Sequence, residues 1–288
     1  MLKVLKNCFL NYRVFPKIPS YYRDLCSLVQ KKNIRTSNYL CTRKEGLHKL
    51  PFDSNRPFVD LSAEEGLLRS VLPAISEEII EEYFILKDNS ELRDRCVKLI
   101  DYNQNIETKF LYAPLIFLHN YKLLEKPSLL SDEKLKQACI LAWCHKLIHS
   151  SLIIVDDIVD KSEIRYNKTA WYQLTDIGKD AAIVDAAFLL NGAIFLLQNH
   201  LRSHPHEYSM HKHFLRAHAL LNLCGISEMK KFNINELEKY QTTVDTKFYI
   251  FNLLSTAMFL TNVTDGYLHE VGEEICNDIS RFLKIQVR

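Results

Sequence analysis

The stretch from Ser131 to Asp160 constrains the fold of this chain more than any other segment. Its apolar residues recur at helical intervals but cover several faces, so a helix formed here must be buried around most of its circumference. The stretch then ends in the acidic run DDIVD, in which Asp156 and Asp157 directly follow the apolar residues LIIV. A helix of this kind belongs at the centre of a helical bundle, with its charged end at the edge of the core.

The small number of turn-forming residues indicates the same fold class. The 288 residues include only 7 Gly and 8 Pro, which leaves few positions for the tight turns of a many-stranded sheet. Helical periodicity recurs along most of the remaining chain. Further helices are predicted over residues 61–84, 90–103, 109–124, 179–201, 209–223, 235–264 and 267–287. The sequence therefore predicts an all-α protein.

Three local signals refine this prediction. Ser62 and Glu65 have the spacing of a capping box, which places the start of the first helix. Pro114 falls within the segment 109–124 and predicts a bend there, because proline removes a helical hydrogen bond. Residues 161–169, directly after the acidic run, are predicted as a loop.

The first 50 residues differ in composition from the rest of the chain. They contain eleven Lys and Arg residues, interspersed with apolar residues, and only two acids, Asp24 and Glu45. This mixture resembles a mitochondrial presequence. We expect residues 1–50 to be a basic leader that directs the protein to mitochondria, and the folded domain to cover residues 57–288. The alternative is a basic leader without a targeting function and a protein located in the cytoplasm.

Several classes of partner are not expected from the sequence. The eight cysteines are scattered without C-x-x-C spacing, as in reduced and mostly buried thiols. Nothing after the leader supplies a basic surface for nucleic acid. The longest apolar runs are interrupted by polar residues before they reach membrane-spanning length, so we expect no transmembrane segment.

The acidic run has the chemistry of a metal site. Asp156 and Asp160 are four residues apart, so their carboxylates share one helical face, while Asp157 lies beside them around the turn. Three carboxylates this close repel one another. The arrangement suits a hard cation with oxygen ligands, above all Mg²⁺, which is commonly shared with a phosphate or diphosphate.

Basic residues follow the acidic run at once. Lys161, Arg165 and Lys168 could meet phosphate oxygens that a metal leaves uncovered. The alternative is a solvated helix end, with Lys161 and Arg165 as incidental ion-pair partners. From the charges alone, both interpretations stand.

A longer signature surrounds the acidic run. The stretch LKQACILAWCHKLIHSSLIIVDDIVDKSEIRYNKTAWYQL resembles the farnesyl diphosphate synthase family of trans-isoprenyl diphosphate synthases. Trp143, Cys144, the D-D-x-x-D run, Arg165 and the residues 171–173 all fall in the family's order, and the resemblance extends roughly over residues 57–286. It implies an all-α isoprenoid synthase bundle with a central prenyl-binding cavity, and a homodimer.

The resemblance also implies an activity. In that family the first aspartate-rich motif binds Mg²⁺ ions that hold an allylic prenyl diphosphate, and the resemblance assigns this role to Asp156, Asp157 and Asp160. Ionisation of the diphosphate gives an allylic cation, which isopentenyl diphosphate then attacks. Arg165 takes the position of a residue that contacts a diphosphate.

The second substrate's positions depart from the family pattern. The stretch TKFLYA keeps Lys109 but has Tyr112 where the family has an arginine. Tyr166 stands in place of the second arginine of a basic pair, and His149 stands in place of a glutamine. Since isopentenyl diphosphate depends on fixed cations rather than on metal, these changes weaken its predicted site.

Two departures lie nearer the C-terminus. The family's Lys-Thr pair aligns with Asp245 and Thr246, and Lys247 is a shifted substitute for the lysine. In the family, a second D-D-x-x-D follows the sequence F-x-I-Q, whereas here FLKIQ is followed only by Val287 and Arg288. The resemblance therefore predicts a chain truncated before its second aspartate motif.

Three hypotheses about function follow from this pattern. The first is an Mg²⁺-dependent prenyltransferase that elongates an allylic diphosphate with isopentenyl diphosphate. The second is a terpene synthase, which ionises a prenyl diphosphate and needs no isopentenyl diphosphate. The third is an inactive or regulatory partner of an active prenyltransferase.

Overall fold

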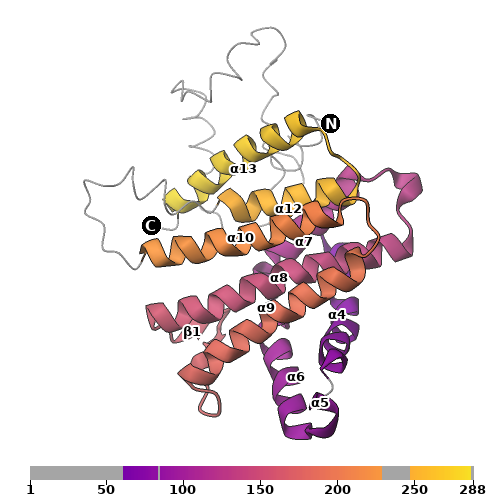
Figure 1. Cartoon of the computed structure of the whole chain (residues 1–288). Coiled ribbons are helices and arrows are strands. Elements are labelled where there is room, and N and C mark those ends of the chain that lie inside the picture. Colours follow the sequence, from indigo (N-terminus) through magenta and orange to yellow (C-terminus); the bar gives the residue numbers. More distant parts are fainter. Residues whose placement is uncertain (1–60, 84, 229–246, 287–288) are drawn as a thin grey trace. The chain divides into compact units, whose positions relative to one another are not determined.

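The structure, a computed structural model, describes residues 61–83, 85–228 and 247–286, and these are helical along most of their length (Figure 1). The predicted all-α fold is confirmed. The leader 1–50 lies outside the described residues. The helices are α4 (Ser62–Glu82), α5 (Ile85–Asp88), α6 (Ser90–Gln104), α7 (Tyr112–Leu124), α8 (Asp132–Asp160), α9 (Lys179–Leu201), α10 (Glu207–Glu228), α12 (Lys247–Leu260) and α13 (Gly266–Gln286).

The helix α8 is the centre of the bundle, as the sequence predicts. It packs against α4, α6, α7, α9 and α10, and Figure 1 shows it crossing the middle of the molecule beside α9. Its start is fixed by Ser131, whose side chain accepts a hydrogen bond from the Lys134 N–H at 3.3 Å. Its end is fixed by Lys161, which adopts the left-handed conformation (φ 58°) and donates its N–H to the Asp157 carbonyl.

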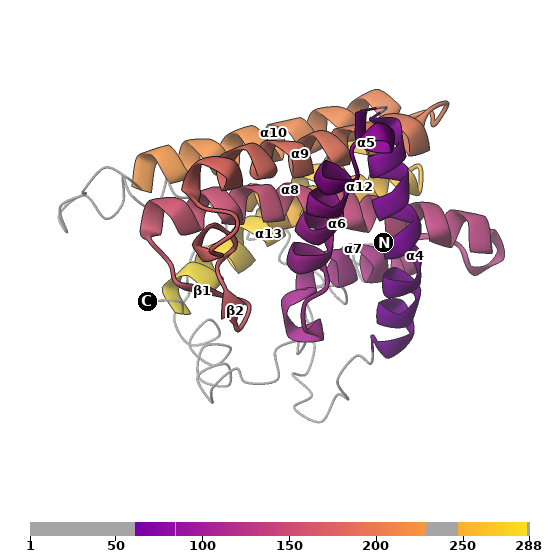
Figure 2. The same cartoon turned by 90° about the horizontal axis from the view of Figure 1, so that it is seen from below.

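A second group of helices closes the core on another side of α8. The short apolar helix α12 packs against α7, α10 and α13. Eight successive residues of α12, from Phe251 to Met258, are buried. Both α9 and α10 pack against α8, and Figure 2, which shows the molecule from below, places the β1–β2 hairpin beside the end of α8.

Both tryptophans of the signature form hydrogen bonds to a neighbouring helix. Trp143 is fully buried and donates its indole N–H to the carbonyl of Leu68 in α4 at 2.8 Å. Trp171 donates to the carboxylate of Asp185 in α9 at 2.8 Å, and Arg95 of α6 donates to the same carboxylate at 2.7 Å. Buried indole N–H groups need such partners. These hydrogen bonds therefore fix the positions of the helices around the site.

Three of the local predictions need correction. Ser62 is the first helical residue rather than the N-cap, which is Leu61 and makes no side-chain capping bond. The Glu65 carboxylate accepts hydrogen bonds from Arg69 (2.7 Å) and Thr108 (2.6 Å). Pro114 is the third residue of α7, where its missing N–H leaves no helical bond unmade, since the predicted helix is divided into η1 (Thr108–Phe110) and α7.

The segment 161–169 is more regular than predicted. It forms an antiparallel hairpin of two short strands, β1 (Ile164–Arg165) and β2 (Lys168–Thr169). Tyr166 and Asn167 between them both have positive φ, 54° and 62°, as a type I′ turn requires. The 3₁₀ helices η2 (Pro127–Leu129) and η3 (Trp171–Gln173) complete the described elements.

Two helices meet the length and apolar content of a membrane span by composition alone. They are α8 and α9. This is a weak indication, because the central helix of a bundle passes the same test, and 78% of the apolar window of α8 is buried inside the chain. For α9 that share is 44%, so part of its apolar surface lies outside the core.

Candidate active site

The acidic run lies at the C-terminal end of α8, where the helix leaves the core. Asp156 and Asp160 are exposed, and on a helix residues four apart project about 40° from each other. Asp157 projects toward the hairpin and is only 2% exposed. The last turn of a helix carries a partial negative charge as well, so this end of α8 attracts cations strongly.

Arg165 of the hairpin supplies one such cation. Its Nε donates to Asp157 Oδ1 at 2.8 Å, and a terminal nitrogen donates to the same oxygen and to Asp156 Oδ2, the latter at 3.3 Å. Burial raises the pKa of Asp157 above its ordinary value, and the hydrogen bonds and charge of Arg165 offset this only in part. The hairpin is therefore clamped to α8 through a largely buried ion pair.

The three carboxylates lie at the end of α8, with Asp156 and Asp160 exposed and Asp157 buried. Across residues 61–83, 85–228 and 247–286, no group of three or more His, Cys, Asp and Glu side chains has the arrangement of a metal site. Asp157 projects about 100° around the helix from Asp156, and the guanidinium of Arg165 contacts both carboxylates. Asp156 and Asp160 do fit Mg²⁺, which commonly uses one or two carboxylates and completes its shell with water and phosphate oxygens. The assignment of Asp157 as a ligand stays a prediction.

Lys109 lies in η1, next to the hairpin. Its Nζ forms an ion pair with Glu107 at 2.9 Å and lies 4.8 Å from the ring centre of Phe110. The Phe110 ring in turn contacts Tyr166 of the hairpin, with 4.9 Å between ring centres. Lys109 thus borders the site, but its charge is already shared with a carboxylate.

His149 lies on α8, two turns before the aspartates, and its ring faces Tyr112 at 6.4 Å. Burial lowers the pKa of His149 to about 3, with smaller contributions from the charges of Lys146 and Arg165. The imidazole is therefore neutral at physiological pH. It can exchange hydrogen bonds with a substrate, but it does not replace a lost cation.

The two tyrosines at the family's arginine positions are also uncharged. Burial raises the pKa of both Tyr112 and Tyr166 above the ordinary phenol value. Tyr112 is the first residue of α7, and Tyr166 is at the hairpin turn. Neither can contribute positive charge to a diphosphate.

Sequence reasoning missed a buried cation in the middle of this region. Lys146 on α8 is 1% exposed, and its Nζ lies 4.9 Å from the ring centre of Tyr166. A signal was present in the sequence, since Lys146 interrupts an otherwise apolar face one turn before Ser150.

The last two predicted contacts, Thr246 and Lys247, are consecutive residues. Thr246 lies outside the described residues. Lys247 is the first residue of α12, and its side chain is likewise not among those described. Their predicted contact with a substrate stays a prediction.

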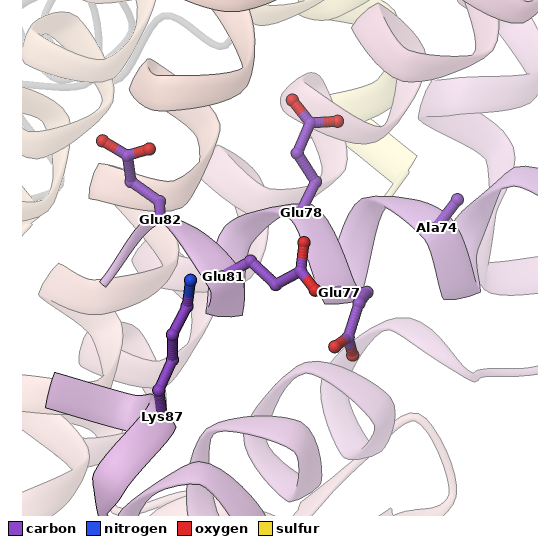
Figure 3. Close-up of a pocket in the computed structure, with 6 residues that line it drawn as sticks. All are labelled: Ala74, Glu77, Glu78, Glu81, Glu82 and Lys87. Atoms are coloured by element: carbon purple, nitrogen blue, oxygen red, sulfur yellow. The ribbon is translucent and has the colours of Figure 1, made fainter. Parts of the chain in front are cut away.

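A hollow of about 540 Å³ lies elsewhere, along α4 and α5. Figure 3 shows its lining, in which Lys87 lies near Glu81 and Glu82 of α4, while Glu77 and Glu78 lie farther along the helix and point away from it. Two of these acids are already engaged: Glu77 with Arg93 at 2.6 Å and Glu78 with His200 at 2.9 Å. None of the predicted site residues lines this hollow.

Comparison with known proteins assigns the chain to a family. The family model described as polyprenyl synthetase matches residues 93–286, which include the acidic run, the hairpin and α13. The chain belongs to the polyprenyl synthetase family. Membership agrees with the resemblance found in the sequence.

Several proteins that the chain resembles are named as prenyl diphosphate synthases. The chain is 25% identical over 204 residues to a farnesyl pyrophosphate synthase of Murgantia histrionica, covering 68% of this chain and 50% of that protein. It is 30% identical over 196 residues to that of Kluyveromyces lactis, covering 64% and 54%. A geranyl diphosphate synthase of Ips pini is 23% identical over 237 residues, covering 75% and 55%. The chain thus spans about half the length of these relatives.

Proposed function

We propose that the chain acts in isoprenoid biosynthesis, binding an allylic prenyl diphosphate at the acidic end of α8 for elongation with isopentenyl diphosphate. Membership of the polyprenyl synthetase family supports the class of reaction. The single observation that carries the proposal is the pair of exposed carboxylates, Asp156 and Asp160, on one face at the end of the central helix.

The donor set suits Mg²⁺ together with a diphosphate. Two carboxylates leave several positions of an octahedral ion open for water and phosphate oxygens. Bound there, Mg²⁺ would supply positive charge to the departing diphosphate and so lower the barrier to breaking the allylic C–O bond. Asp157 joins the ligands in this proposal only when Arg165 releases it.

The chain's own residues have distinct tasks. Asp156 and Asp160 hold the cation, and Arg165, already 3.3 Å from Asp156, is close enough to the same end of α8 to donate to a phosphate oxygen. The partly exposed apolar residues of α8 that precede Asp156, Leu152, Ile153 and Val155, would contact a prenyl tail and be shielded from water by it. Exclusion of water there protects an allylic cation from hydrolysis.

Calorimetric titration with geranyl diphosphate tests the proposal. We expect binding in the presence of Mg²⁺ that is lost in a chelator, and Asp160→Asn should weaken it about tenfold or more. Glu163→Gln is the matched control, because it removes one exposed carboxylate three residues further along. Equal effects of the two substitutions would place the metal elsewhere.

A terpene synthase is the second candidate, and the uncharged tyrosines at the hairpin and at the start of α7 favour it. Incubation of geranyl or farnesyl diphosphate with and without isopentenyl diphosphate separates the two candidates. A hydrocarbon or alcohol formed without isopentenyl diphosphate supports the terpene synthase. No turnover alone, with a changed product length when the chain is mixed with an active synthase, supports the regulatory partner.

We also propose a homodimer that uses the exposed apolar side of α9. Ile183 and Val184 are 47% and 69% exposed, and they lie on a helix whose apolar window is less than half buried. A second copy of the chain would remove this surface from water. Sedimentation of the full chain tests the proposal, and Val184→Glu should shift the protein toward monomer.

A further inference from the structure

Two histidines from different helices approach one buried serine. Ser255 of α12 is fully buried, and its Oγ lies 3.4 Å from His213 Nε2 of α10 and 3.2 Å from His269 Nδ1 of α13. The three side chains therefore link α10, α12 and α13 through a single hydroxyl group. None of them belongs to the site at the end of α8.

The direction of these hydrogen bonds follows from the last acceptor. His269 Nε2 lies 2.9 Å from the carbonyl oxygen of Val263, which can only accept, so this nitrogen carries the hydrogen. In the neutral ring, Nδ1 then has a lone pair and accepts from the Ser255 hydroxyl. The hydroxyl oxygen in turn accepts from His213 Nε2. A proton added to His269 Nδ1 would break this series, because two donors would then face each other.

The surroundings of His213 disfavour its charged form. Its ring is half-buried and packs against the rings of Phe251 and Phe259, with 6.0 Å and 5.4 Å between ring centres. The pKa of His213 falls to about 4, mainly because burial disfavours a charged imidazole. The ring is therefore neutral at physiological pH, as the contact with Ser255 allows.

The charged groups that face His213 are mostly positive. Lys212 and Arg216 of its own helix, together with His269 of α13, add to the lowering of its pKa. Glu273 of α13 lines the same small crevice and has the opposite sign. The residues that α12 presents to the ring are uncharged. A protonated His213 would therefore be repelled on balance by its described neighbours.

The helix α13 depends on few contacts for its position. Its only extensive contact with another described helix is with α12, and Figure 1 shows it at the border of the described helices. His269, Gly272 and Cys276 recur at helical intervals on one side of α13. A Cβ on Gly272 would lie 3.0 Å from Leu254 Cδ2 of α12, and Cys276 is fully buried. This side of α13 is therefore the one that rests on the bundle.

We propose that His213, Ser255 and His269 form an acid-sensitive clasp, which holds α13 on α12 and α10 at neutral pH and releases it in acid. The released form binds more protons than the clasped form. Since His213 changes from a pKa of about 4 to its ordinary 6.5 on release, the clasp is fully stable above about pH 6.5 and is lost as the pH falls through 4. At pH 5 the population of the released form should be about thirtyfold larger than at pH 7.5.

Thiol labelling of the full chain with dithiodipyridine, which reacts in acid, measures this release. The Cys276 thiol is buried, so it reacts when α13 moves away. Cys144 of α8 is also fully buried and reports unfolding of the whole bundle. Peptide mass spectrometry distinguishes the two cysteines, and the unfolded chain in urea gives the intrinsic reactivity at each pH. We expect Cys276 labelling to rise about thirtyfold from pH 7.5 to 5, with Cys144 still protected.

Three variants assign the release to the clasp. His213→Gln keeps a donor for Ser255 but does not titrate, so its Cys276 labelling should change about twofold or less between these pH values. His211→Gln is the matched control, because it replaces a half-buried histidine of the same helix outside the clasp, and it should keep the thirtyfold rise. Ser255→Ala removes the link between the rings and should speed Cys276 labelling about tenfold at pH 7.5. Circular dichroism verifies that each variant is folded.

Three results would overturn the clasp. An equal rise in His213→Gln and in the unaltered chain would show that another group controls the release. Labelling of Cys144 in parallel with Cys276 would mean that acid unfolds the whole bundle rather than releasing α13. Unchanged Cys276 labelling in Ser255→Ala at pH 7.5 would show that the hydroxyl does not hold this helix.

Discussion

Replacing Lys146 by methionine should stabilise the folded chain at low pH and lose this advantage as the pH rises. The pKa of this lysine falls from 10.5 to about 7 because burial disfavours the charged amine. Each tenfold change in proton affinity corresponds to about 1.4 kcal/mol, so below pH 7 the buried charge costs the folded state about 5 kcal/mol. Methionine removes this cost with a side chain of similar length.

Part of the gain is offset. The variant loses the hydrogen bonds from Lys146 to Ser150 and to the Asn103 carbonyl, at about 1 kcal/mol each. The expected net effect is a stabilisation of about 3 kcal/mol near pH 6. Above pH 7 the unfolded chain keeps a proton on this amine that the folded chain has released, so the unaltered protein becomes more stable by about 1.4 kcal/mol for each pH unit. The two proteins should be similar near pH 9.

Urea unfolding followed by tryptophan fluorescence measures this directly, since both tryptophans are buried. The quantity to compare is the difference in unfolding free energy between Lys146→Met and the unaltered chain, at each pH from about 6 to 9. Other titrating groups are common to both proteins and cancel. A difference that does not change with pH would refute the reasoning, because Lys146 would then be charged in the folded state, with a partner or solvent compensating it.

Three further predictions test the contacts that stabilise the helical bundle and the function of the leader. Arg165→Gln leaves the buried Asp157 carboxylate without its cation and should lower the unfolding free energy by about 2–3 kcal/mol at neutral pH, less at acidic pH where the carboxylate is protonated; urea titration at two pH values measures it. Trp143→Phe removes the donor to the Leu68 carbonyl and should cost about 1–3 kcal/mol by the same assay, and no loss would mean that this bond does not hold α4 to α8. A fluorescent protein fused behind residues 1–60 should enter mitochondria, and one fused behind the same segment with its lysines and arginines replaced by glutamine should not. Uptake of both fusion proteins would show that mitochondrial targeting does not depend on the basic residues.

The sequence was sufficient for features that depend on neighbours along the chain. Helical periodicity over 132–160 predicted the central helix because apolar side chains on several faces can be satisfied only inside a bundle. The side chain of Ser131 determines where α8 starts, and the ordered signature around the aspartates was enough to recognise the family.

The tertiary structure decided which of these residues face one another. The hairpin was not predicted, because its turn places Tyr166 and Asn167 at positive φ, which sequence patterns assign to glycine and asparagine rather than tyrosine. Its pairing with α8 places Arg165 against both aspartates, but it buries only Asp157 and leaves Asp156 largely exposed, although the two are adjacent in sequence.

The burial of Lys146 is the clearest feature that only the tertiary structure decides. Within the sequence it is one lysine on an apolar helix, and nothing nearby along the chain says whether its amine reaches water. Its amine contacts the Asn103 carbonyl of α6, 43 residues earlier, and the ring of Tyr166 in the hairpin, 20 residues later, so the packing of both segments against α8 helps to enclose it. Burial of a charge depends on what covers it, and what covers this amine comes from distant parts of the chain.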